Sequence, residues 1–303
     1  MKVSGKTVNL SNMYGDTTDK MQEGISQFMN AVDGGYFTPA QVQGLMVTLN
    51  VDLYQLMNFL VPYATKYATP PISNFQVGAV AHGLSGAIYF GANIEFYNEA
   101  LSFTVHAEQA SIAHAISYGE TGIDCLAISA APCGYCRQFL YEITNCSSTP
   151  DITILINKEQ YLLSALLPQA FGPQDLSVTT RLMLPQNNNI QLIPPPADQF
   201  IENALIAANK SYSPYTFDYS GVCLVTTNGC YVGAYAENAA YNPSMSPLEA
   251  AVVQLIMSGD SYANINRAIL VEAQTNKISQ LTATTDVLSA IAESVKLEYY
   301  QAT

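Results

Sequence analysis

The chain has 303 residues, enough for one large domain or two ordinary ones. Only 11 residues are lysine or arginine and the formal net charge is −13, which argues against a nucleic-acid partner because polyanion binding normally needs a positive surface. No apolar run reaches the roughly 20 residues that span a bilayer, and the polar start has no signal-peptide pattern. Six cysteines in a chain of this length favour a reducing compartment. We therefore expect a cytoplasmic protein that does not interact with a membrane.

The apolar spacing and capping signals within residues 1–50 predict a helical segment that precedes the first domain. Helical apolar spacing between Met21 and Met29 ends at Gly34-Gly35. Thr38-Pro39 is a cap followed by a proline at the first helical position, and it predicts a second helix. A third, strongly apolar helix is predicted over about residues 52–67.

Residues 51–185 alternate between predicted strands and helices, which is typical of a layered α/β domain. We expect a hairpin of two strands, a helix that begins close to His106, a buried strand, a helix that begins at Pro132, a further strand and a last helix. Their expected ranges are, in order, 75–81 and 87–92, 107–117, 124–130, 132 onward, 152–156 and 161–167.

Segments of this region recur after a stretch rich in asparagine and proline, residues 186–196, which we interpret as a linker. Residues 66–70 recur as 210–214 and residues 91–95 recur as 233–237. The segment His106-Ala107-Glu108 aligns with Pro247-Leu248-Glu249. Residues 197–303 are therefore predicted to be a second, degenerate copy of the first domain, without its C-x-x-C pair.

Two short motifs gather side chains that can bind a metal. His106 and Glu108 stand at the start of one predicted helix, and Cys133 and Cys136 stand at the start of another. Zinc prefers cysteine sulfur and histidine nitrogen, and a catalytic zinc has three protein ligands and keeps a fourth position for water. His106, Cys133 and Cys136 would supply three ligands. Glu108, beside the fourth position, is better suited to moving protons than to binding metal.

Other interpretations of these residues remain open. A C-x-x-C pair alone also occurs in structural zinc sites and in redox pairs, but a structural zinc needs four protein ligands. The spare candidates Cys125, Cys146 and His114 lie in no matching motif. Glu108 could instead simply stabilise the first turn of its helix.

The combination H-x-E followed by P-C-x-x-C is the signature of zinc-dependent deaminases. With residues 74–79, 91–96 and 170–176, it makes the chain resemble the larger, two-domain cytidine deaminases of bacteria and plants, from about Leu53 to near the C-terminus. The resemblance implies a three-layer α/β/α fold with a mixed sheet, present twice in the chain. It also implies a homodimer with one Zn²⁺ per chain.

The resemblance further implies an activity and roles for individual residues. The activity is hydrolytic deamination of cytidine and 2′-deoxycytidine to the corresponding uridines, with Glu108 as the catalytic acid and base. Asn93 and Glu95 would bind the ribose hydroxyls, although taken alone they are a turn residue and a surface residue. The pyrimidine contacts would be a packed ring from Phe75, a backbone group from Ala107 and, from the partner subunit, Phe171.

The alternatives within this chemistry are a deaminase of another base, of a nucleoside antibiotic or of a polynucleotide. From a different class, the alternative is a zinc-stabilised binding protein without catalytic activity. The acidic composition argues against a polynucleotide, and an intact Glu108 argues against a merely structural zinc.

Overall fold

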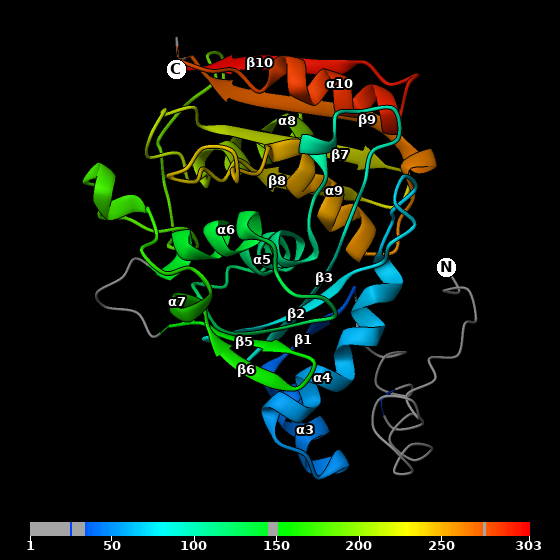
Figure 1. Cartoon of the computed structure of the whole chain (residues 1–303). Coiled ribbons are helices and arrows are strands. Elements are labelled where there is room, and N and C mark those ends of the chain that lie inside the picture. The colour runs from blue at the N-terminus through cyan, green and yellow to red at the C-terminus, as the bar shows by residue number, and fades with distance from the viewer. Residues whose placement is uncertain (1–24, 26–33, 145–150, 275–276) are drawn as a thin grey trace.

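The computed structural model describes residues 25, 34–144, 151–274 and 277–303, and it contains two mixed β-sheets with helices between and outside them (Figure 1). This confirms the predicted α/β class with a duplicated domain. The helix predicted between Met21 and Met29 lies outside the described residues except for Ile25, which is buried.

The first sheet carries the elements that build the site. Its strands in chain order are β1 (Tyr36–Phe37), β2 (Gly78–Gly83), β3 (Ile88–Ala92), β4 (Ile123–Ile128), β5 (Thr153–Ile156) and β6 (Glu159–Leu162). Across the sheet the order is β1-β3-β2-β4-β5-β6, with a parallel pair only at β4 and β5. The predicted hairpin is confirmed as β2 and β3. The segment before α3 also contributes an edge strand, β1, which the sequence did not predict.

The helices of the first half are α3 (Pro39–Leu49), α4 (Leu53–Ala64), α5 (Ala107–Ser117), α6 (Gly134–Thr144) and the short α7 (Leu163–Leu166). Thr38 and Asp52 cap α3 and α4, each in a reciprocal capping box with a glutamine three residues later. The prediction of a helix over residues 161–167 is wrong at its start, because α7 begins only at Leu163. Residues 159–162 instead form strand β6, which supplies hydrogen-bond partners to the backbone groups along the edge of β5.

The second half repeats the arrangement with strands β7 (Ser220–Thr226), β8 (Cys230–Ala234), β9 (Ile265–Ala273) and β10 (Leu297–Ala302), in the order β10-β9-β7-β8. Its helices are α8 (Gln199–Asn209), α9 (Pro247–Met257) and α10 (Leu281–Ile291). As in the first half, one strand pair is parallel, here β9 with β10.

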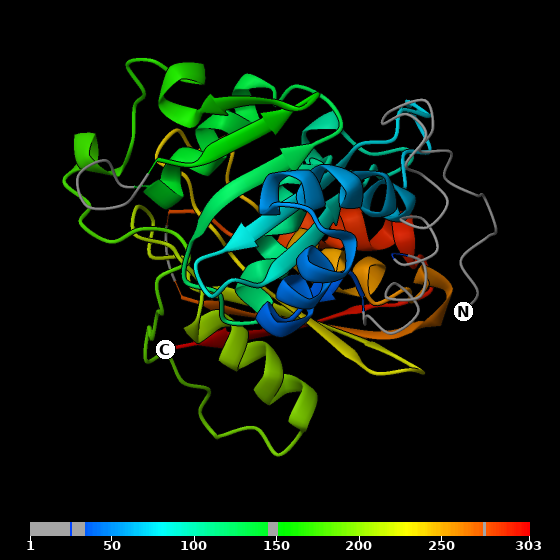
Figure 2. The ribbon, with the colours of Figure 1, turned by 90° about the horizontal axis from the view of Figure 1, so that it is seen from below.

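The two halves face each other through helices. α4 covers the outer face of the first sheet and α8 that of the second, while α5 and α9 pack on each other between the sheets. The view from below shows α3 and α4 lying over the first sheet (Figure 2). Each inner helix lies directly on a glycine of its sheet. A Cβ at Gly91 would stand 2.2 Å from the Ser111 backbone nitrogen, and one at Gly233 would stand 2.2 Å from that of Ala251.

Backbone pairing establishes which residues of the two halves correspond. Ile94 bridges Thr69 on one side and Val105 on the other, and Ala236 bridges Tyr212 and Met245 in the same senses. Two of the sequence alignments are therefore wrong by one residue. Thr69 corresponds to Tyr212, so that Pro71 and not Pro70 matches Pro214. Val105 corresponds to Met245, so that the residue matching His106 is Ser246 and not Pro247.

Residues 186–196 contain no helix or strand and run along the second sheet. Gln191 exchanges two backbone hydrogen bonds of 2.9 Å with Thr303, and the side chains of Ile190 and Leu192 are buried among apolar residues of the second half.

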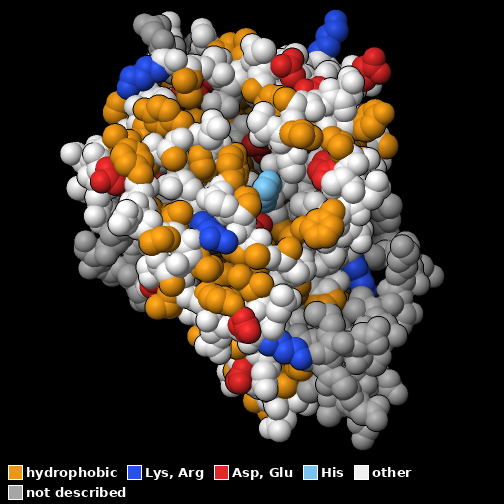
Figure 3. Space-filling view, in the orientation of Figure 1, with side chains coloured by type: hydrophobic (Ala, Val, Ile, Leu, Met, Phe, Trp, Pro, Cys, Tyr) orange, Lys and Arg blue, Asp and Glu red, His pale blue; other side chains and the backbone are white. Residues whose placement is uncertain are grey.

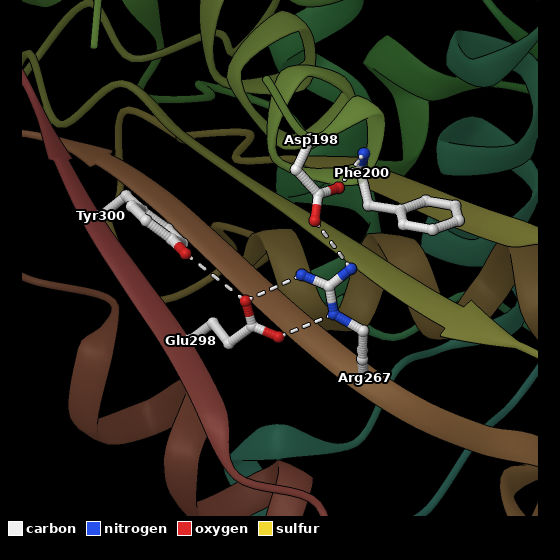
Figure 4. A network of polar contacts seen from close by, with 5 residues as sticks. All are labelled: Asp198, Phe200, Arg267, Glu298 and Tyr300. Atoms are coloured by element: carbon white, nitrogen blue, oxygen red, sulfur yellow. Dashed lines mark hydrogen bonds and ion pairs between the residues drawn. The ribbon is translucent and has the colours of Figure 1, made fainter. Parts of the chain in front are cut away.

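Beside this segment, an ionic network joins the start of α8 to the second sheet (Figure 4). The Arg267 guanidinium on β9 contacts Asp198, the cap of α8, at 2.9 Å and binds the Glu298 carboxylate on β10 through two nitrogens. Each side chain is about one-third exposed, so the pairs contribute modestly to stability.

Among the described residues, no single helix has both the length and the apolar character to cross a membrane. One pair, Pro39–Leu49 with Leu53–Tyr67, meets both criteria together but is bent by 102°.

Candidate zinc site

His106 is the residue immediately before α5. Its backbone is extended, with φ −82° and ψ 155°, and its N–H donates to the Gln109 side-chain oxygen at 3.2 Å. Its carbonyl accepts the first helical bond, from Ala110. The imidazole therefore projects from the start of the helix and is not needed for the backbone hydrogen bonds that begin it.

The two cysteines stand at the start of α6. The helix begins at Gly134 and not at Pro132, because the Cys133 carbonyl accepts the first helical hydrogen bond, from the N–H of Arg137 at 3.1 Å. Cys133 is thus the capping residue and Cys136 belongs to the first turn. Residues three apart share a helix face, so both sulfurs lie on the same side.

The three donor atoms are arranged as a zinc ion requires. The His106 Nδ1 atom lies 3.5 Å from the Cys133 Sγ and 3.2 Å from the Cys136 Sγ, and the two sulfurs lie 3.7 Å apart. Tetrahedral zinc bonded to sulfur at about 2.3 Å and nitrogen at about 2.0 Å separates two sulfurs by about 3.8 Å and sulfur from nitrogen by about 3.5 Å. The donor set and its spacing therefore fit zinc. This is the one group of three or more potential metal ligands among the described ranges.

The sulfurs are prepared to bind a cation. Hydrogen bonding between them lowers the pKa of Cys133 to about 5 and raises that of Cys136, which is also buried. One thiolate is therefore favoured at neutral pH. A bound metal ion would displace the second proton, since only the thiolate is a strong ligand.

Glu108 lies in the first turn of α5 and is only 3% exposed. Burial raises the pKa of its carboxyl, while its own backbone N–H, the neighbouring His106 and the Cys136 thiol act in the opposite direction. A buried carboxyl with a raised pKa beside the metal donors is suited to carrying a proton.

Asn93 and Glu95 follow β3 and hold the loop of residues 72–77. The Asn93 amide donates to the Phe75 carbonyl and accepts from the Val77 N–H, each at 2.9 Å. Glu95 accepts from the N–H groups of Ile72 and Ser73 at 2.9 Å and from the Ser73 hydroxyl. Burial alone would raise the pKa of Glu95, but these hydrogen bonds outweigh it and hold the pKa below its usual value. Both residues are thus buried loop anchors, which their sequence context did not indicate.

The remaining predicted site residues differ in exposure. Ala107 is fully buried at the start of α5, whereas Phe75 and Phe171 are 61% and 46% exposed. The Phe171 carbonyl accepts from the Gln138 side chain of α6 at 2.7 Å, so its segment lies against the helix that carries the cysteines. The face shown in Figure 3 has hydrophobic side chains and few charged ones around a hollow.

The second half lacks the ligands at all corresponding positions. Ser246 matches His106 and Leu248 matches Glu108, while Gln280 and Ala283 stand at the start of α10 where α6 has Cys133 and Cys136. Glu249 corresponds to Gln109, and the side chain of each accepts a hydrogen bond from the backbone N–H of the residue before its helix. The predicted loss of the second site is therefore explained by different residues from those that sequence comparison selected.

Two stretches of the chain, residues 52–147 and 163–285, match family models described as the cytidine and deoxycytidylate deaminase zinc-binding region. Curated proteins named cytidine deaminase are similar over most of the chain. The protein from Vibrio vulnificus is 44% identical over 247 residues, covering 81% of this chain and 82% of its own. The protein from Aliivibrio fischeri is 39% identical over 282 residues, covering 93% and 94%.

The chain belongs to the cytidine deaminase family. Its duplicated form accounts for the two matches, and the His106, Cys133 and Cys136 cluster lies within the first. The crystal structure of cytidine deaminase from Mycobacterium tuberculosis is 30% identical and covers 39% of this chain and 97% of its own, with a TM-score of 0.35.

Proposed function

We propose that this cytidine deaminase family member hydrolyses cytidine and 2′-deoxycytidine to uridine and 2′-deoxyuridine. The observation that carries the proposal is the buried Glu108 beside three donors whose separations match the edges of a zinc tetrahedron. The relatives named cytidine deaminase, which align over most of the chain, support the same reaction.

His106, Cys133 and Cys136 would hold the zinc ion, which would supply Lewis acidity and make a water molecule more acidic, with its pKa moved from 15.7 towards about 7. Glu108 acts as the proton carrier. It takes one proton from the attacking water and delivers it to N3 of the pyrimidine. It then takes the remaining proton from the new C4 hydroxyl and delivers it to the amine that leaves C4. One C–O bond forms at C4, one C–N bond breaks, and water is consumed as ammonia is released.

Asn93 and Glu95 are proposed to orient the ribose while they hold the 72–77 loop. The Asn93 amide still has one N–H and one oxygen lone pair available beyond its bonds to Phe75 and Val77. Glu95 Oε1 accepts only from the Ser73 hydroxyl, which leaves it one further lone pair for a ribose hydroxyl. The same two residues would thereby fix the position of Phe75 against the pyrimidine, and the backbone of Ala107 would contact the base edge.

The active unit is proposed to be a homodimer in which Phe171 closes the partner's pyrimidine pocket. Phe171 is 46% exposed although its carbonyl is held by Gln138, so its side chain can reach a second subunit.

The cytoplasm is the proposed compartment. The cysteines of the described residues are all free, and the zinc donors must remain reduced to bind the metal.

The test is a spectrophotometric deamination assay of the zinc-loaded protein with cytidine, 2′-deoxycytidine, cytosine and a cytosine-containing oligonucleotide, with and without a chelator. We expect turnover of the two nucleosides only, lost on zinc removal and restored by zinc. Zinc-loaded protein that turns over none of these compounds would support a non-catalytic zinc-binding role instead. Turnover of the oligonucleotide alone would favour the polynucleotide alternative, against which the net charge of −13 argues.

A further inference from the structure

We propose that residues 238–243 of the second half, here called the bracing loop, position the zinc ligands of the first half through Tyr135 and Gln109. This loop corresponds to residues 96–103 of the first half, as the pairing around Ile94 and Ala236 shows. Tyr135 and Gln109 are positioning residues in this proposal, since they act on the substrate only through the zinc ligands that they contact.

Tyr135 connects the cysteine pair to the bracing loop. It lies between the two cysteine ligands in the chain, and its hydroxyl donates to the Asn242 carbonyl at 2.5 Å. Its ring also lies over the third ligand, with a centroid 5.6 Å from that of the His106 imidazole and an angle of 32° between the planes. The Tyr135 ring thus contacts the His106 ring, and the Tyr135 backbone belongs to the same helical turn as both cysteines.

Gln109 connects the histidine to the same loop. Its side-chain oxygen accepts from the His106 N–H at 3.2 Å, and its side-chain nitrogen donates to the Pro243 carbonyl at 3.2 Å. Gln109 is 3% exposed, so these bonds are shielded from water. The two carbonyls that accept these hydrogen bonds belong to consecutive residues of the bracing loop. The loop therefore fixes the distance between the start of α5 and the start of α6.

The contact continues along one face of α6. The Asn238 amide donates to the Gln138 carbonyl and the Ala239 N–H donates to the Glu142 carboxylate, each at 3.0 Å. Residues 135, 138 and 142 are three and four apart and so share one helix face. Buried Glu142 also accepts hydrogen bonds from Tyr212 and Tyr215. The second half thus holds α6 along its length, from the cysteine ligands to its last turn.

This arrangement gives the second half a function that does not require a site of its own. Zinc needs its three donors at one set of separations, and these donors come from two helices. Partners that orient ligands from outside the coordination shell typically contribute about 10–100-fold to metal affinity. The degenerate copy would supply such partners.

The test compares zinc-loaded wild type with Tyr135→Phe and Gln109→Glu. The first substitution keeps the ring over His106 and removes the hydroxyl, and the second keeps the acceptor for the His106 N–H and removes the donor to Pro243. We expect zinc transfer to a competing chelator to be about 10-fold faster in each variant. We also expect shifted visible absorption bands after replacement of zinc by Co²⁺. In the deamination assay, kcat should fall more than KM changes.

Tyr231→Phe is the matched control, because it removes a tyrosine hydroxyl bond, to Asp260 at 2.9 Å, within the second half and away from the loop. It should lower the melting temperature without changing zinc release or the Co²⁺ bands. Wild-type zinc release and Co²⁺ bands in either test variant would overturn the proposal, even with a lowered melting temperature. The kinetic readout rests on the proposed deaminase function, whereas zinc release and the Co²⁺ spectrum decide the inference even if that function is wrong.

Discussion

Ser246 occupies in the second half the helix-capping position that His106 occupies in the first. Each residue precedes its helix, and its N–H donates to the side chain three residues later, Gln109 for His106 and Glu249 for Ser246. The Ser246 hydroxyl accepts from the Glu249 N–H at 3.2 Å and so caps its own helix. The His106 imidazole instead faces the two cysteine sulfurs. The same backbone position therefore serves helix capping in one copy and metal binding in the other.

The first prediction is that each chain binds one zinc ion. Ser246, Gln280 and Ala283 replace all three metal donors in the second half, and Leu248 replaces the carboxyl. Metal analysis of the purified protein should give one zinc per chain, and Ser246→His should not add another because no thiolates face that position. A ratio of two zinc ions per chain would contradict this explanation.

Glu108→Gln should keep zinc and lose most deaminase activity. Glutamine has nearly the same shape but cannot carry a proton, and acid–base groups typically contribute about 10²–10⁴-fold to the rate. Zinc content and kcat are measured on the same preparation. A zinc-free variant would show that Glu108 is needed to bind the metal, and near-wild-type kinetics would exclude it as the proton carrier.

Mixing Phe171→Ala subunits with Glu108→Gln subunits should restore activity. If Phe171 acts on the partner's pocket, each mixed dimer has one site with an intact Glu108 and an intact Phe171. Activity is measured before and after exchange, with mixed dimers verified by native mass spectrometry of differently tagged chains. Verified mixed dimers without a gain in activity would place Phe171 in the site of its own subunit.

Glu249→Gln should stabilise the protein above neutral pH. Glu249 is 7% exposed, and burial raises its pKa from 4.5 to about 7. Between these values the folded state holds a proton that the unfolded state has lost, so the free energy of unfolding falls as pH rises and is constant above about pH 7. A neutral glutamine removes this pH-dependent loss of stability. It also preserves the helix cap, because Gln109 makes the corresponding bond in α5.

The gain should approach about 3 kcal/mol at pH 8, since one pKa unit corresponds to about 1.4 kcal/mol. It should be small at pH 5, where the folded state keeps the proton and the unfolded state has lost it only in part. Melting temperatures of wild type and variant at the two pH values test this directly. A gain at pH 5 equal to or larger than that at pH 8 would show that burial of the Glu249 charge is not the cause.

Local sequence determined much of this protein. The cap at Thr38, the bounds of α5 and the grouping of His106, Cys133 and Cys136 follow from side chains close together in the chain, whose hydrogen bonds and metal preferences are short-range. The duplication was also visible, because glycines and carboxylates recur in the same order. Roles carried only by family resemblance, such as those of Phe75, Ala107 and Phe171, remain predictions.

Tertiary structure alone decided which residues meet across the two halves. The loop before α9 is shorter than the loop before α5, so sequence comparison matched Pro247 with His106, whereas the backbone bridges of Ile94 and Ala236 show that Ser246 holds that position. Residues 161–162 became part of β6 because β5 offered an edge to pair. The contact of Tyr135 with Asn242 joins residues 107 apart in the chain. Such contacts depend on how whole helices and sheets pack, and no local pattern of side chains encodes that packing.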